Sequence, residues 1–165
     1  MADHGSTLNA PGKILLMRHA EKPGDPTNPC LTEAGRHRAD RLAMFIPAMF
    51  GKPDFVFAAA VNKHSFRAYL TMRPLCDAIA IGLDTSFESD GYRALANKLF
   101  ADPFVAGKLV VVCWTHKELP KLANALKARQ GDYPEPWDAS VFNLILELDY
   151  RGEVAPTVTS IVQPF

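Results

Sequence analysis

The sequence lacks an excess of charge of either sign. Its 165 residues contain 18 lysines and arginines against 18 aspartates and glutamates, so the formal net charge is zero. Proteins that bind nucleic acids usually carry a marked basic excess, so we predict no nucleic-acid partner, although a local basic pocket is compatible with this balance. Long hydrophobic runs are lacking as well. No segment approaches the roughly 20 apolar residues that cross a bilayer, so we expect no membrane-spanning segment.

Cysteine is scarce, and its spacing excludes two common uses. Cys30, Cys76 and Cys113 are odd in number and far apart, and no CxxC pair occurs. We therefore expect neither a disulfide framework nor a cysteine zinc site. The histidines also lack the HxH or HExxH spacing of a metal site. Three reduced thiols are typical of a cytoplasmic protein, which is the location we predict.

The first twelve residues, MADHGSTLNAPG, lack the apolar core of a signal peptide, and we expect them to form a disordered leader. Residues 13–165 contain no internal repeat, low-complexity tract or linker. This length suits one domain with a substantial core.

Apolar runs alternate with amphipathic segments along these residues. Helices are expected after the N-cap Thr32 as far as Gly51, after Asn62 or Ser65 with a kink or new start at Pro74, and over residues 92–100 and 119–131. Strands are expected at 13–17, 54–61, within 81–87, at 108–114, and as a closing hairpin in 141–150 and 154–162. The alternation predicts an α/β protein: a three-layer α/β/α sandwich with a mostly parallel central sheet and an antiparallel edge.

Four polar residues follow predicted strands or open predicted helices. Arg18 and His19 end the first apolar run, Arg67 opens a helix, and His116 follows the run KLVVVCW. Ligands of open α/β sheets bind beyond the carboxyl ends of the strands, so these side chains are expected to converge on one pocket. Guanidinium groups match phosphate oxygens, and an imidazole in line with phosphorus can act as a nucleophile. The pattern therefore predicts a phosphate site.

These segments resemble the signatures of the histidine phosphatase superfamily, which has the phosphoglycerate-mutase-like fold. The similar segments occur in family order and are LLMRHAEKP, LTEAGRHRA, SFRAYLTM and VVVCWTHKELPKLANAL. Only about forty residues separate Arg67 from the KLVVVCW run, which leaves no room for a large cap domain, so the chain resembles the small, minimal members. The likeness implies that His19 is the phosphorylated nucleophile, that Arg18, Arg67 and His116 bind the phosphoryl group, and that neither a metal nor a nucleotide cofactor is needed.

Two departures from the family pattern concern the rim of the pocket. Lys63 and His64 stand where the family often has Ser-Pro, and Thr115 stands where it often has Gly. We expect His64 and Lys22 to bind substrate at this rim.

The proton donor for the leaving group is less well defined by the sequence. Glu88 and Asp90 are the candidates, and Glu88 is preferred because it directly follows the apolar end of a predicted strand. A phosphohistidine substrate would not need a donor. The function we expect is hydrolysis of a phosphomonoester or phosphohistidine, on a small molecule or a phosphoprotein. A non-catalytic phospho-ligand binding module and a phosphoglycerate-mutase-type phosphotransferase are the alternatives, and the sequence does not indicate an oligomeric state.

Overall fold

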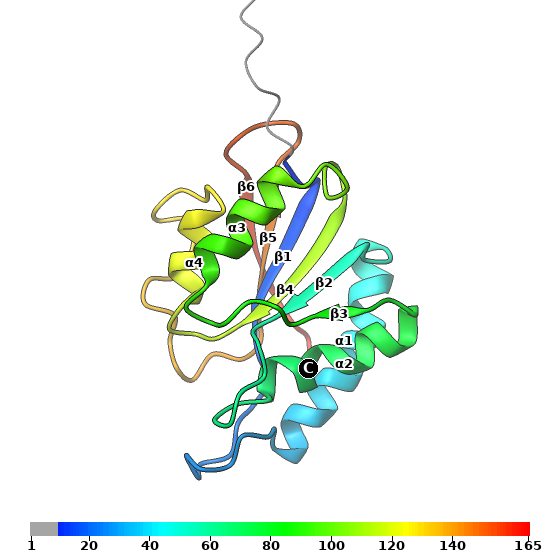
Figure 1. The fold of residues 1–165 in the computed structure, drawn as a ribbon. Coiled ribbons are helices and arrows are strands. Elements are labelled where there is room, and N and C mark those ends of the chain that lie inside the picture. Colours follow the sequence, from blue (N-terminus) through cyan, green and yellow to red (C-terminus); the bar gives the residue numbers. More distant parts are fainter. Residues whose placement is uncertain (1–9) are drawn as a thin grey trace, which may run out of the picture.

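A six-stranded mixed sheet forms the centre of the protein (Figure 1). The computed structural model describes residues 10–165. The strands are β1 (Lys13–Arg18), β2 (Phe55–Ala58), β3 (Leu83–Asp84), β4 (Leu109–Trp114), β5 (Leu144–Asp149) and β6 (Thr157–Val162), and they lie in the order β3-β2-β4-β1-β5-β6. Strands β3, β2, β4 and β1 pair in parallel, whereas β5 is antiparallel to both β1 and β6. The predicted mostly parallel sheet with an antiparallel edge is confirmed.

Four helices cover the two faces of this sheet. They are α1 (Glu33–Phe50), α2 (Arg67–Ile79), α3 (Tyr92–Ala101) and α4 (Leu119–Ala125). Figure 1 shows α1 and α2 on one side of the sheet and α3 and α4 on the other, as predicted for a three-layer sandwich. No helix within residues 10–165 has the length and apolar character needed to cross a membrane.

The two central strands are buried on both faces, which explains their uninterrupted apolar sequences. All of Ile14 to Met17 in β1 and Val110 to Trp114 in β4 are inaccessible to solvent. The strands run in parallel register, with Arg18 opposite Trp114 at their carboxyl ends. The residues that follow both strands therefore meet at one edge of the sheet.

The helix boundaries agree with the sequence signals at α1 and at α3 (Tyr92–Ala101) but differ at α2 and α4. The Thr32 side chain accepts a hydrogen bond from Gly35 N and caps α1, which ends before Gly51 as expected. Helix α2 continues through Pro74 with no new helix starting there, and residues on both sides of the proline, Met72 and Leu75, are buried in the core. Its N-cap position is Phe66, not Asn62 or Ser65. Asn62 accepts hydrogen bonds within its own turn, and Ser65 Oγ accepts one from Arg67 N at 3.3 Å. Helix α4 ends at Ala125, six residues before the predicted end, because Lys127 adopts a positive φ of 73°.

The end of the predicted leader is ordered. Pro11 forms a bridge with Ala106, and Gly12 N donates a hydrogen bond to Lys108 O. Backbone pairing with the turn before β4 is a long-range contact that local composition does not reveal, and it ties residues 11 and 12 to the domain. The rest of the predicted leader, residues 1–9, lies outside the described residues.

Candidate active site

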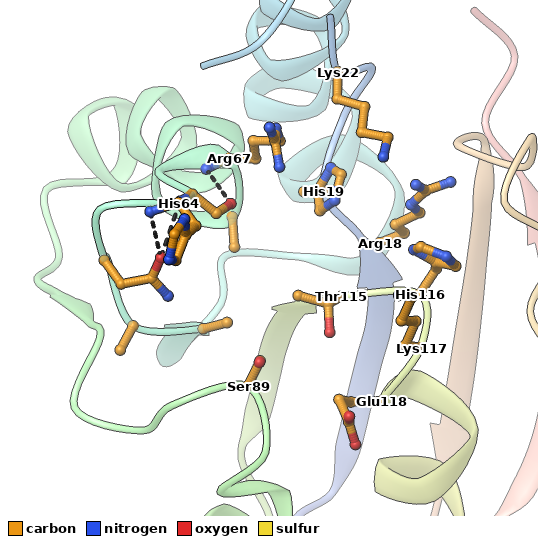
Figure 2. Close-up of a pocket in the computed structure, with 15 residues that line it drawn as sticks. Arg18, His19, Lys22, His64, Arg67, Ser89, Thr115, His116, Lys117 and Glu118 are labelled. Carbon is orange, nitrogen blue, oxygen red and sulfur yellow. Dashed lines mark hydrogen bonds between the residues drawn. The ribbon is translucent and has the colours of Figure 1, made fainter. Parts of the chain in front are cut away.

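Six of the predicted site residues line one cavity at the carboxyl edge of the parallel strands. The cavity has a volume of about 340 Å³. The six are Arg18, His19, Lys22, His64, Arg67 and His116. Figure 2 shows His19 between the guanidinium groups of Arg18 and Arg67. Residues separated by almost a hundred positions are thus brought together, as the order of the strands requires.

His19 is held in a single orientation by the backbone around it. Its side chain is almost completely buried, with the residue 4% exposed, and its main-chain N–H donates to Trp114 O. Nδ1 lies 2.8 Å from Ala20 O. A carbonyl oxygen can only accept, so Nδ1 carries the proton and Nε2 keeps its lone pair. The imidazole therefore presents a nucleophilic nitrogen.

Burial lowers the pKa of His19 to about 4, and the charges of Arg18 and Arg67 act in the same direction. The ring is therefore neutral at pH 7, as a nucleophile must be. The hydrogen bond to Ala20 O opposes this shift but does not outweigh the burial.

Arg18 carries two buried nitrogens without a partner. The residue is 1% exposed, and its NH1 donates to Ala139 O at 2.6 Å. The Phe142 ring lies 3.9 Å from its guanidinium carbon, which is close enough for a cation–π contact. Nε and NH2 have no hydrogen-bond partner among residues 10–165. Since buried donors are normally satisfied, this pair is suited to two oxygens of an anion.

Arg67, at the start of α2, is anchored by the loop that precedes α1. Its Nε donates to Cys30 O at 3.3 Å and its NH2 to Asn28 O at 2.6 Å. These carbonyls use part of the guanidinium fork and fix its direction. Its remaining donors face the same cavity as His19.

His116 lies among the cations that line the cavity. It follows β4, and its pKa is lowered by partial burial first and then by the charges of Arg18, Lys22 and Lys117. Among the described lining residues, Arg18, Lys22, Arg67 and Lys117 are cations. This concentration of positive charge in a protein of zero net charge makes the cavity suited to an anion and disfavours a metal ion.

The structure does not bring the predicted proton donor into the cavity. Glu88 and Asp90 are exposed and do not line it, whereas Ser89, between them, does. The reason is a non-local contact: the buried Trp114 indole donates to Ser89 O at 2.8 Å and sets the path of this loop. Glu88 therefore does not line the cavity that contains His19, and its role as the acid stays a prediction without support from this geometry.

Glu118, which the sequence analysis did not single out, is the one carboxylate among the described lining residues. Its Oε2 lies 3.3 Å from Lys121 Nζ, and Figure 2 shows its carboxylate pointing away from His19. Its position two residues after His116 was the only available signal. No carboxylic acid in the described chain is thus directed at the nucleophile within this cavity.

The rim residues behave differently from each other. Lys22 follows the nucleophile in sequence and acts electrostatically on His116. In Figure 2, His64 and Arg18 lie on opposite sides of His19. His64 is in a turn held by hydrogen bonds from His64 N and Ser65 N to Asn62 Oδ1. Both side chains are exposed, so a substrate would reach them without a change in the core.

The pKa of His19 can be tested directly by an NMR titration of its imidazole protons. We expect a midpoint of about 4 in the free protein. This value lies below the unfolded-state value of about 6.5, so protonation of His19 disfavours the folded state. The free energy of unfolding should therefore fall as the pH drops from about 6.5 to about 4. Adding tungstate should raise the midpoints of His19 and His116, because an anion favours the cationic rings. A midpoint of His19 near 6.5 in the free protein would contradict this interpretation.

Comparison with known proteins places this geometry in a fold family. No protein-family model matches the chain, and no curated protein shows significant sequence similarity to it. Solved structures, in contrast, do match the fold of this chain. The protein histidine phosphatase SixA, complexed with tungstate, superposes with a TM-score of 0.66 at 16% identity, over 91% of this chain and 96% of that one.

The chain has the histidine phosphatase fold. Two further structures agree. The SixA protein of Agrobacterium tumefaciens matches with a TM-score of 0.63 at 19% identity, over 92% of this chain and 98% of that one. The mycobacterial glucosyl-3-phosphoglycerate phosphatase Rv2419c, with inorganic phosphate, matches with a TM-score of 0.57 at 15% identity, over 93% of this chain and 97% of that one. The resemblance to small histidine phosphatases predicted from the sequence is confirmed at the level of the fold.

Proposed function

We propose that this protein is a metal-independent phosphatase that forms a covalent phosphohistidine on His19. One observation carries the proposal: a neutral imidazole with a free Nε2 lies in the same cavity as two buried, unpartnered nitrogens of Arg18. On this proposal, His19 supplies the nucleophile and Arg18 supplies donors to the phosphoryl oxygens, and both residues line the cavity before a substrate arrives. Preorganised donors of this kind supply most of the catalysis in phosphoryl transfer.

The reaction proceeds in two balanced steps. The Nε2 lone pair of His19 attacks phosphorus, the bond from phosphorus to the leaving group breaks, and the leaving group departs with that electron pair. Arg18, Arg67 and His116 bind the phosphoryl oxygens during the transfer. Water then attacks phosphorus, the P–N bond breaks, inorganic phosphate leaves with one proton lost to solvent, and the imidazole is restored.

The leaving group decides which substrates suit this cavity. An alkoxide must be protonated as it departs, and no carboxylic acid among the described lining residues points at His19. A phosphorylated imidazole needs no such acid at the reacting nitrogen, because its other ring nitrogen can take a proton from solvent near the ordinary imidazole pKa of about 6.5, and imidazole then departs as a neutral molecule. This favours phosphohistidine, or an activated phosphoester, over an alkyl phosphate. The substrate would be a phosphorylated protein or an exposed small molecule, since the rim residues Lys22 and His64 are open to solvent.

Two alternatives share this geometry. A binding module would hold the phosphoryl group without turnover, and a mutase would return it to a reoriented product. The low pKa of His19 favours an enzyme over a module, because binding alone does not require an unprotonated imidazole. The open cavity favours hydrolysis over a mutase, because a mutase must retain its intermediate product.

Rapid quenching during turnover tests the proposal. With phosphorylated imidazole or a phosphohistidine protein as substrate, we expect an acid-labile, alkali-stable phosphate that mass spectrometry assigns to His19. The same experiment on an alkyl phosphate should show slower labelling. Tight substrate binding without labelled His19 would support the binding module instead, and transfer of label to an organic acceptor would support the mutase.

A further inference from the structure

The peptide between Ala20 and Glu21 connects the nucleophile His19 with an ion pair that Glu21 forms with Arg38 of α1. The carbonyl that fixes the His19 tautomer is Ala20 O, and it belongs to the peptide joining Ala20 to Glu21. The orientation of this peptide plane therefore determines the direction of the imidazole. Whatever holds Ala20 and Glu21 in place also holds His19.

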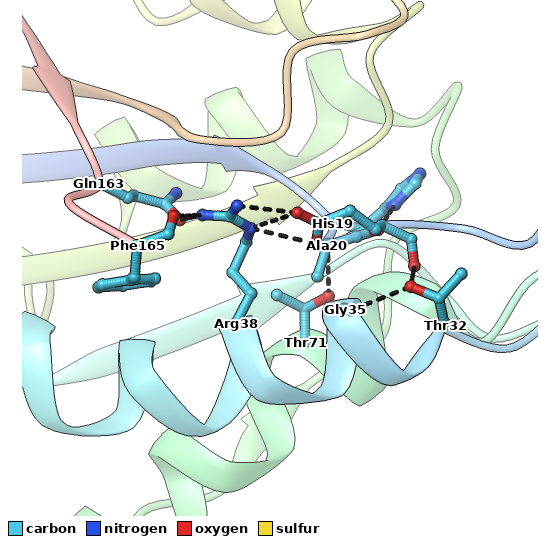
Figure 3. Close-up of polar contacts among 9 residues, drawn as sticks. His19, Ala20, Thr32, Gly35, Arg38, Thr71, Gln163 and Phe165 are labelled. Carbon is cyan, nitrogen blue, oxygen red and sulfur yellow. Dashed lines mark hydrogen bonds and ion pairs between the residues drawn. The ribbon is translucent and has the colours of Figure 1, made fainter.

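The residues on the two sides of this peptide are anchored by α2 and by the N-cap of α1. Ala20 N donates to Thr71 Oγ1 of α2 at 2.9 Å, and Thr71 is completely buried. Glu21 O accepts from Thr32 N at 3.0 Å. Gly35 lets α1 approach closely, because a Cβ there would stand only 2.5 Å from Glu21 O. Figure 3 shows these contacts around the segment that follows His19.

The Glu21 side chain is held by Arg38 with an unusually complete set of contacts. Arg38 Nε lies 2.8 and 3.1 Å from the two carboxylate oxygens of Glu21, and NH2 lies 2.8 Å from Oε1. The third nitrogen, NH1, donates to Gln163 Oε1 at 2.9 Å and to Phe165 O at 2.8 Å. All three guanidinium nitrogens are thus engaged, and the Arg38 side chain is only 12% exposed.

This arrangement differs from an ordinary surface ion pair. A single exposed pair leaves both side chains free to move and contributes little. Here Gln163, which directly follows β6 and is 2% exposed, holds the Arg38 guanidinium, and the guanidinium in turn holds Glu21. The ion pair does not face the phosphate cavity, because neither residue lines it.

We propose that Arg38 is a positioning residue for His19, acting through Glu21 on the Ala20–Glu21 peptide that selects the nucleophilic tautomer. The proposal rests on the proposed function of His19 as nucleophile. Misplacing a reacting group by about 1 Å costs roughly a hundredfold in rate. Loss of Arg38 should therefore slow the attack of His19 on phosphorus while leaving oxyanion binding intact.

The test compares Arg38→Met with Arg41→Met. Arg41 lies one turn along α1, near the same Phe165 ring, but has no hydrogen bond or ion pair with Glu21. Arg38→Met should lower the rate constant for His19 phosphorylation by about 10- to 100-fold and change the tungstate dissociation constant by less than about threefold. Arg41→Met should change neither. Nitrogen-15 NMR should show the Nδ1–H tautomer of His19 in the wild type and in Arg41→Met, and a mixture of tautomers in Arg38→Met.

Further variants keep the test decisive if Arg38→Met is poorly folded. Glu21→Gln removes the same ion pair from the other side, and the double variant should lose no more rate than Arg38→Met alone, because both changes break one connection. Arg38→Lys should recover part of the rate. An unchanged rate in Arg38→Met, or a lowered rate with the wild-type tautomer retained, would overturn the proposal. If the wild type itself never forms phosphohistidine, the proposed function fails, and the tautomer comparison still decides the role of Arg38.

Discussion

Replacing His19 with asparagine is expected to abolish phosphoenzyme formation and to lower kcat by at least roughly four orders of magnitude. Asparagine retains a polar group beside Ala20 but has no nitrogen lone pair that can attack phosphorus. Arg18, Arg67 and His116 are untouched, so tungstate should still bind. The measurement is single-turnover kinetics with a phosphorylated imidazole, together with calorimetric binding of tungstate.

A matched control is available in His37→Asn. His37 lies on the exposed face of α1, 3.8 Å from Glu33, and does not line the cavity. This variant should retain wild-type turnover. If His19→Asn keeps more than a few per cent of the wild-type rate while His37→Asn is normal, His19 is not the nucleophile, and direct attack by water in the anion site becomes the better description.

The parts of this site that sequence could predict are those encoded by local patterns. A buried strand is recognisable from a short apolar run, and a polar residue directly after it points to the sheet edge where ligands bind. Arg18, His19 and His116 are all of this kind, and Arg67 follows from the motif at the start of its helix. Their shared cavity is a consequence of parallel strands whose carboxyl ends meet.

The parts that could not be predicted depend on contacts between distant segments. Glu88 was preferred because of its position after a predicted strand, but the path of its loop is set by the Trp114 indole, 25 residues away. The Ala139 carbonyl and the Phe142 ring support Arg18 from a loop with no motif of its own. The pairing of Arg38 with Gln163 spans 125 residues and involves ordinary surface residue types. Local propensity carries no information about such pairs.

Replacing Arg18 with methionine is expected to separate stability from activity. The variant removes two donors to the phosphoryl oxygens, and loss of one such donor typically costs about a hundredfold to a thousandfold in kcat. We therefore expect at least a roughly hundredfold fall in kcat and a clear loss of tungstate affinity. Folding should respond in the opposite sense, because the variant also removes a buried charge whose Nε and NH2 find no partner in the part of the chain that the structure describes.

Burial lowers the pKa of Arg18 to about 10, which reflects the cost of keeping this charge away from water. Methionine fills a similar volume and keeps a favourable contact with the Phe142 ring, at the expense of the hydrogen bond to Ala139 O. On balance we expect the free energy of unfolding to rise by about 1 kcal/mol. Denaturant unfolding with and without tungstate measures this: the anion should stabilise the wild type and the exposed control Arg129→Met, but not Arg18→Met. A less stable Arg18→Met that still gains stability from tungstate would show that Arg18 serves the fold and not the anion.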